Sequence, residues 1–179
     1  MLRPLFPRLI VAVAAALSAS ASHAMDLAGW IGRSQTASSV TVFLVPPMAL
    51  FNTSLGEAQM QAAGCRFTTV DAAAIGALAT LLKAGKVDGN VVYQRPDIRE
   101  GVYLTLADGG QLKLLLEDNN GGKLPVVGVA ETAVGGDFER VAVTAGRTLA
   151  TDVRRWAATH GGEGTGSACN RLSPVAAER

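Results

Sequence analysis

The sequence predicts an α+β fold: a mainly antiparallel sheet of about five to six strands, packed by two to three helices, in a single domain with one disulfide. Two patterns in the 179-residue chain carry this prediction. Several segments have apolar residues at every second position, which is typical of strands with one buried face. One segment, 72–85, has apolar residues at helical spacing, so it can cover such a face.

The stretch from Gly101 to Glu117 predicts a β-hairpin around which the chain is organised. Facing residues of an antiparallel pair have a constant index sum, so pairing Leu104 with Leu114 and Leu106 with Leu112 requires the three-residue loop 108–110. A two-residue loop would place leucines on opposite faces. The expected inward side chains are Val102, Leu104, Leu106, Leu112, Leu114 and Leu116. The helix over 72–85 is expected to cover them, with Leu78 and Leu82 facing the sheet.

The remaining elements are expected in the following order along the chain. A short helix and a polar link occupy 25–39, a strand occupies 40–45, and the capping box Ser54-x-x-Glu57 opens a helix that runs through Ala63. A strand over 65–70 precedes the helix that Asp71 caps, and a strand over 91–94 precedes the hairpin. Strands over 125–132 and 138–144 and a helix ending near Gly161 complete the domain, which spans 40–160, and 161–179 form a flexible tail tethered by Cys169.

The segment 138–144 also permits a helix, because Phe138, Val141, Ala145 and Leu149 keep helical spacing. Three β-branched residues within or next to that range favour a strand, and Gly146 interrupts a longer helix. We therefore predict a strand there, with the helix as the alternative.

The first 24 residues are typical of a signal peptide. Arg3 and Arg8 precede the apolar run 9–17, and Ser22-His23-Ala24 has small residues at the positions that a signal peptidase reads. The alternative is an uncleaved anchor, but the run is shorter than the roughly 20 apolar residues of a membrane span. Cleavage after Ala24 would make Met25 the first residue and place the protein in the periplasm or outside the cell, with no stable membrane span.

Charge and cysteine content bear on the expected partners and on the presence of a disulfide. The leader holds two of the 16 Lys and Arg residues, so the rest of the chain has 14 of them against 15 Asp and Glu residues. Because that part of the chain is nearly neutral and has no basic run, nucleic acid is not an expected partner. Cys65 and Cys169 are the two cysteines, and an even count in an exported chain predicts a disulfide. The alternatives are free thiols or a redox pair, although a redox pair usually has C-x-x-C spacing.

Motifs for catalysis and metal binding are scarce. His160 is the one histidine after the leader, and its place at a helix end indicates a structural role toward the terminal carbonyls or the helix dipole. No Gly-x-Ser-x-Gly motif is present, and too few nitrogen and sulfur ligands exist for zinc. The segment 118–122 is rich in oxygen ligands but lacks EF-hand spacing, so it is interpreted as a turn. No metal and no cofactor is predicted.

One polar cluster stands out before and within the hairpin. Its members, expected to bind a partner because tyrosine and arginine are favoured at binding hot spots, are Tyr93, Arg95, Asp97, Arg99, Glu100 and Tyr103. A solvated loop with local ion pairs is the plainer interpretation. The carboxylates of Asp97 and Glu100 would do acid–base work only if they faced each other in a cleft.

These observations favour an exported, non-enzymatic binding protein, such as an inhibitor or accessory factor that binds a protein of the cell envelope. The alternative is a small carboxylate-dependent hydrolase. The sequence does not predict the oligomeric state.

Overall fold

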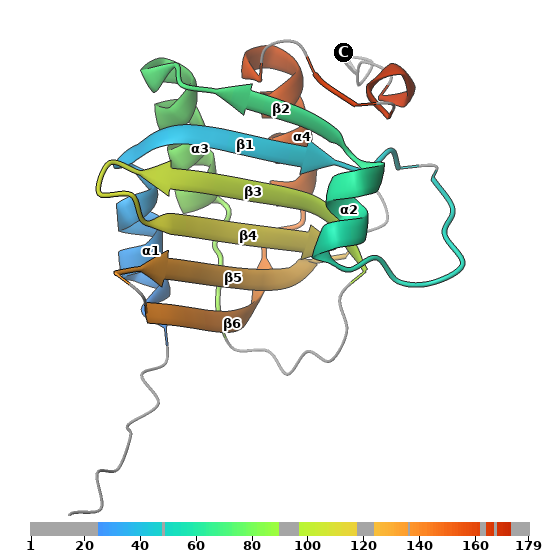
Figure 1. Cartoon of the computed structure of the whole chain (residues 1–179). Coiled ribbons are helices and arrows are strands. Elements are labelled where there is room, and N and C mark those ends of the chain that lie inside the picture. The colour runs from blue at the N-terminus through green and yellow to red at the C-terminus, as the bar shows by residue number, and fades with distance from the viewer. Residues whose placement is uncertain are drawn as a thin grey trace, which may run out of the picture.

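The computed structural model describes residues 25–47, 49–89, 97–117, 124–135, 137–161, 164–166 and 168–172. These residues form a six-stranded antiparallel sheet with the order β2-β1-β3-β4-β5-β6 (Figure 1). The strands are β1 (Ala37–Leu44), β2 (Cys65–Thr69), β3 (Ile98–Leu106), β4 (Gln111–Glu117), β5 (Val126–Val134) and β6 (Asp137–Ala145). The helices are α1 (Leu27–Ser34), α2 (Glu57–Ala63), α3 (Ala72–Ala84) and α4 (Leu149–His160), followed by a 3₁₀ turn at Cys169–Arg171. The α+β prediction is confirmed.

Three helices, α1, α3 and α4, cover one face of the sheet and enclose the main core (Figure 1). All six side chains expected to point inward from the hairpin are buried there, together with Leu78 and Leu82 of α3. Asp71 caps α3 as predicted, since its Oδ1 accepts a hydrogen bond from Ala74 N at 2.7 Å. The indole of Trp156 from α4 donates to Ala74 O at 2.8 Å, which ties α4 to α3.

The hairpin keeps the predicted faces but not the predicted register. Leu104 faces Leu112, and Val102 faces Leu114, so the index sum is two lower than expected. A shift of two residues leaves every side chain on its own face, which is why the buried set is unchanged. Leu106 N donates to Gly110 O at 2.8 Å, so the three-residue loop is 107–109, with Gly109 at a positive φ of 82°. Asp108 Oδ1 accepts a hydrogen bond from Gly110 N and holds this loop.

Three local predictions meet a clear outcome. The segment 138–144 lies in strand β6, which decides against the helical alternative. The polar link expected before residue 40 is wrong from residue 37 on, because β1 already begins at Ala37 and pairs with β3. The capping box is also wrong: α2 begins at Glu57, and its N-cap is Gly56 without a side-chain cap. The reason is that Asp97 Oδ1 takes the hydrogen bond of Leu55 N, which holds this part of the chain in a loop.

The C-terminal segment is fixed beside β2. Cys65 and Cys169 form the predicted disulfide, with Cα atoms 4.7 Å apart and a sequence separation of 104. Arg66 and Thr165 exchange two backbone hydrogen bonds, at 2.9 and 2.8 Å. The described residues between Gly164 and Leu172 therefore lie beside β2, held there by the disulfide at Cys169 and by the bridge at Thr165.

Several predictions lie outside the described residues: the signal peptide over 1–24, the strand over 91–94 and the turn over 118–122. Among the helices that the structure describes, none has the length and apolar content to cross a membrane.

Candidate binding surface

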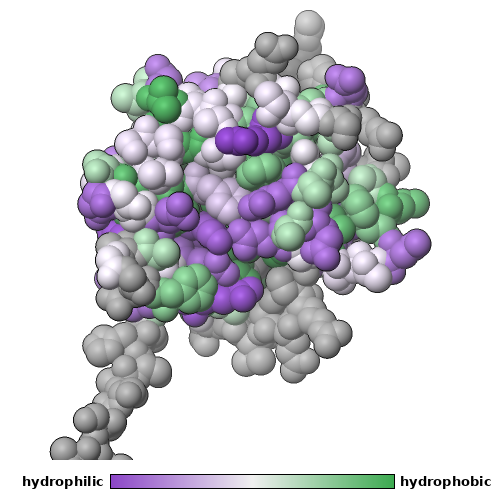
Figure 2. Space-filling model, viewed as in Figure 1, coloured by the Kyte–Doolittle hydropathy of each residue, from purple (hydrophilic) through white to green (hydrophobic). Residues whose placement is uncertain are grey.

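The face of the sheet opposite the three helices is largely open, with α2 over one end only (Figure 1). One row of side chains crosses this face from strand to strand, because each of its members lies directly opposite the next in the pairing register. In sheet order the row is Thr68, Thr41, Tyr103, Lys113, Glu131 and Arg140. Figure 2, which shows this side of the molecule, has hydrophilic side chains across the middle of the face.

The charges of this row and of Glu57 in α2 neutralise one another. Lys113 Nζ lies 3.0 Å from Glu57 Oε1 of α2 and 3.5 Å from Glu131 Oε2. Arg140 Nε lies 3.2 Å from Glu131 Oε1, on the other side of the same carboxylate. The Glu131 side chain is only 6% exposed, although it belongs to an open face. A carboxylate buried to this degree needs both cations, because desolvation otherwise penalises its charged form.

Tyr103 lies at the centre of the row, beneath α2. Its hydroxyl donates to Glu57 Oε1 at 3.0 Å and accepts a hydrogen bond from Gln61 Nε2 at 2.8 Å. Its ring meets Phe43 edge to face, with centroids 5.5 Å apart, and Lys113 Nζ lies 5.8 Å from its centroid. The hydroxyl is thus held in place by two residues of one helix.

Neither Tyr103 nor Lys113 is suited to act as a base at neutral pH. Burial, aided by the negative charge of Glu57, raises the pKa of Tyr103 far above its ordinary value. For Lys113, burial alone would lower the pKa, but the hydrogen bond and charge of Glu57 and the charge of Glu131 outweigh it and raise the pKa. A general base needs a pKa near the working pH, so neither of these two groups is suited to proton abstraction at neutral pH.

A small second core fixes α2 to this face. Its buried members are Val45, Leu55, Met60, Ile98 and Leu115. Gly101 leaves room for it, since a Cβ atom there would lie 2.6 Å from Met60 Cε and 2.8 Å from Tyr103 Cε2. The sheet therefore buries apolar side chains on both faces at this end.

The loop before α2 is held by two of the predicted site residues. Arg99 Nε and Nη2 donate to Asp97 Oδ2 at 2.9 and 2.7 Å, and Arg99 Nη1 donates to Ala49 O at 2.9 Å. The other Asp97 oxygen accepts from Leu55 N at 2.8 Å. One ion pair thus holds both ends of the loop 49–55, which we name the anchored loop.

The anchored loop presents apolar side chains to solvent. Leu50 is 96% exposed, and the neighbouring Phe51 is also exposed, with the Arg99 guanidinium 5.1 Å from its ring centroid. In Figure 2, hydrophobic side chains gather where this loop runs beside α2. Contiguous exposed apolar side chains are one feature of interaction sites, and the neighbouring Leu50 and Phe51 give this loop a small patch of that kind.

The predicted site residues are thus divided by the structure. Tyr103 belongs to the polar row, Asp97 and Arg99 hold the anchored loop, and Tyr93 and Arg95 lie outside the described residues. Glu100 points to the helix-covered side, where it is fully buried and pairs with Arg154 of α4. Arg154 also donates to Val45 O at 3.0 Å.

Asp97 and Glu100 consequently do not form a carboxylate pair. Asp97 binds backbone and side-chain groups of the anchored loop and its neighbours, whereas Glu100 is occupied by a guanidinium on the opposite side of the sheet. The facing arrangement that glycoside hydrolysis requires is absent for these two residues.

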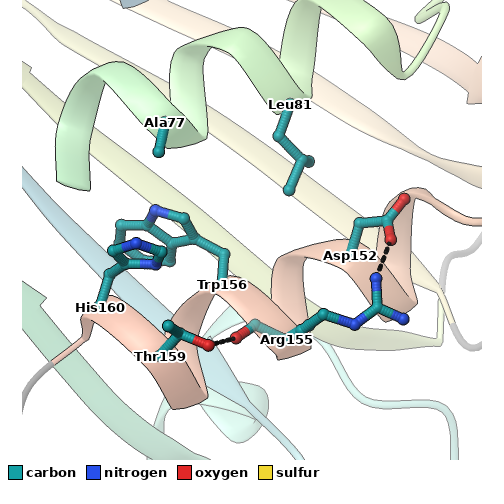
Figure 3. Close-up of a pocket in the computed structure, with 7 residues that line it drawn as sticks. All are labelled: Ala77, Leu81, Asp152, Arg155, Trp156, Thr159 and His160. Atoms are coloured by element: carbon teal, nitrogen blue, oxygen red, sulfur yellow. Dashed lines mark hydrogen bonds and ion pairs between the residues drawn. The ribbon is translucent and has the colours of Figure 1, made fainter. Parts of the chain in front are cut away.

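A shallow groove of about 250 Å³ lies between α3 and α4, away from the sheet (Figure 3). His160 stacks on Trp156 there, with ring centroids 6.1 Å apart, and Arg155 pairs with Asp152 at 2.8 Å. At the helix end the Ala157 carbonyl accepts its hydrogen bond from Gly161 N, and His160 lies in the last turn of α4, where a role toward the helix dipole was the other prediction. The nearby Thr159 hydroxyl donates to Arg155 O, so the groove holds no nucleophile directed at His160.

Sequence reasoning missed most of the polar row. The missed members are Thr41, Thr68, Lys113, Glu131 and Arg140, and the missed helix partners are Glu57 and Gln61. Lys113, Glu131 and Arg140 are polar residues at alternate positions of otherwise apolar strands, which is a usable signal for an outward face. Within the described part of the chain, no three His, Cys, Asp or Glu side chains come together as a metal site.

No protein-family model matches the chain, and comparisons with curated proteins and with solved structures likewise give no match.

Proposed function

We propose that this chain is an exported, non-enzymatic binding protein that engages a protein of the cell envelope, as an inhibitor or accessory factor. The partner docks on the anchored loop and on the adjoining open face. The observation that carries this proposal is the clamp formed by Asp97 and Arg99, which holds an exposed Leu50 and Phe51 in a fixed position beside that face.

Electrostatics of the surface support binding over catalysis. The titratable groups of the polar row are paired with one another, and the pKa values of Tyr103 and Lys113 are both raised. Location in the periplasm or outside the cell agrees with the disulfide between Cys65 and Cys169, since such bonds persist in oxidising compartments.

The test is capture of the partner from an envelope fraction by crosslinking, with matched variants of the exposed apolar residues. Leu50→Glu places a charge in the centre of the proposed contact and should abolish capture. Val70→Glu is the control, because Val70 is 76% exposed but lies between β2 and α3, away from the anchored loop. Equal capture by both variants would contradict the proposed surface.

Arg99→Ala tests whether binding depends on the fixed position of the anchored loop or only on its side chains. This variant keeps Leu50 and Phe51 but removes the hydrogen bonds to Ala49 O and Asp97. A loop that must be reordered on binding loses affinity, so we expect weaker capture with unchanged stoichiometry. Capture equal to that of the unaltered protein would mean that the clamp has no role in binding.

A further inference from the structure

The anchored loop places one side chain wholly in solvent, between two points where the chain is held. In Figure 1 this loop projects beyond the end of the sheet, beside α2. Leu50 is 96% exposed, whereas the next residue, Phe51, is 38% exposed. An apolar side chain that projects alone from a fixed loop fits a pocket on a partner, which is how interface anchors contribute most of their binding energy.

The contacts that hold the loop lie directly on both sides of Leu50. Before it, Arg99 Nη1 donates to the carbonyl oxygen of Ala49 at 2.9 Å. After it, the Phe51 ring has its centroid 5.1 Å from Cζ of the same guanidinium. Arg99 is itself held, because its side chain is only 15% exposed and donates to Asp97 Oδ2 at 2.9 and 2.7 Å. One arginine therefore fixes the chain on both sides of the peptide bond between Leu50 and Phe51.

A loop of this kind has the properties of a peptide substrate that is ordered before it binds. A serine peptidase recognises the side chain that precedes the bond it attacks, and in chymotrypsin the pocket for that side chain is an apolar slot. Leu50 is apolar and exposed, so it can enter such a slot while the rest of the loop keeps its contacts. A loop that is fixed beforehand does not lose affinity by being ordered. Complexes of peptidases with their protein inhibitors are among the tightest known for their size.

We propose that the anchored loop inhibits a serine peptidase with an apolar primary pocket, by presenting Leu50 to that pocket as a substrate does. This inference rests on the function proposed above, since it uses the same surface and names the class of partner that docks there. The feature that carries it is the placement of Arg99, which holds Ala49 O before Leu50 and the Phe51 ring after it.

The same contacts explain why the loop inhibits the peptidase and is not consumed by it. When the peptidase serine attacks the Leu50 carbonyl carbon, an ester forms, the bond to the Phe51 nitrogen breaks, and the serine proton passes to that nitrogen. The new amine stays near the ester, because Phe51 lies against Arg99 and Leu55 N is bound to Asp97 Oδ1 at 2.8 Å. An amine held in this way attacks the ester, restores the peptide bond and returns the proton to the serine oxygen.

The test uses the full, oxidised protein and two peptidases that differ in the primary pocket, chymotrypsin and trypsin. With a chromogenic peptide substrate, we expect an inhibition constant for chymotrypsin at least about a hundredfold lower than that for trypsin. Leu50→Lys should reverse this preference, because it presents a basic side chain at the same exposed position. Val70→Lys is the matched control and should leave both constants unchanged, since Val70 is exposed but lies between β2 and α3.

Arg99→Ala tests the contacts on both sides of Leu50. It keeps the side chain that enters the pocket but removes the hydrogen bond to Ala49 O and the contact with Phe51. Mass spectrometry should then show chymotrypsin cleaving the bond between Leu50 and Phe51 at least about tenfold faster than in the unaltered protein. If Arg99→Ala fails to fold, the change of preference caused by Leu50→Lys still decides.

Four outcomes would overturn the proposal. They are no inhibition of chymotrypsin, rapid cleavage of the unaltered loop, a Leu50→Lys variant that does not inhibit trypsin, and binding to phosphatidylcholine vesicles in place of chymotrypsin. Capture of an envelope protein that depends on Leu50, without inhibition of chymotrypsin, would leave the proposed function standing and remove only this inference. Inhibition of chymotrypsin with no envelope protein captured would instead contradict the envelope partner.

Discussion

Leu115 gives the sharpest test of the two-sided packing at the α2 end of the sheet. It points to the open face, yet it is only 2% exposed, because α2 and the anchored loop cover it with Met60 and Leu55. A sheet with one buried face would leave this residue in water, and Leu115→Ala would then change stability by less than about 1 kcal/mol. Removing a buried leucine side chain instead costs about 2–5 kcal/mol, according to how well the site collapses.

The expected magnitudes differ between the two faces. Met60 is flexible and can fill part of the space left by Leu115→Ala, so we expect about 2–3 kcal/mol for that variant. Leu114→Ala, in the main core, should cost about 3–5 kcal/mol, and Thr105→Ala, which is exposed, less than about 1 kcal/mol. Urea unfolding followed by tryptophan fluorescence, with equal m-values, measures all three. A cost for Leu115→Ala as small as that for Thr105→Ala would refute the second core.

Three further predictions concern the Cys65–Cys169 disulfide, Tyr103 and the export of the protein. Replacing both Cys65 and Cys169 by alanine should lower the free energy of unfolding, measured in urea, by up to about 4–5 kcal/mol for a loop of this length. A loss below about 1 kcal/mol would show that the disulfide is not a major restraint. In an absorbance titration, Tyr103→Phe should remove the tyrosine that ionises well above pH 10.0, because the pKa of Tyr103 is raised in the folded protein. The stability contributed by neutral Tyr103 is therefore complete below pH 10.0 and is lost as the pH rises above it. Ionisation of Tyr103 near pH 10.0 would contradict its burial. N-terminal sequencing of the exported protein should begin at Met25, and an intact Met1 would show that no leader is removed.

The helix-covered face of the sheet was predictable because alternate residues of the hairpin are apolar and all of them point to that face. Alternation in the hairpin identified the inward residues, and the apolar stripe of α3 identified their cover, including Leu78 and Leu82. The absolute register was not predictable, because a shift of two residues preserves every face. What fixes it is the turn, where Leu106 pairs with Gly110 and Gly109 takes the left-handed conformation.

The candidate surface was predictable only in part, because the row depends on strand order. Tyr103 and Lys113 are neighbours within one hairpin, but Glu57, Glu131 and Arg140 come from separate elements whose arrangement the sequence does not state. The closeness of Asp97 and Glu100 in sequence predicts one loop cluster. The strand begins at Ile98, with an irregular register between Ile98 and Glu100, so the two carboxylates separate to different sides of the sheet.

The structure also indicates how affinity and orientation would be divided at the proposed surface. Leu50 and Phe51 are held by Arg99 before any partner arrives, so a complex need not order this loop. The charges of the row are already paired, with Glu131 nearly buried between Lys113 and Arg140, and breaking such pairs to form new ones gains little. We therefore expect the apolar side chains of the loop to set the dissociation rate and the row to fix the orientation of the partner, so that added salt changes the affinity only slightly.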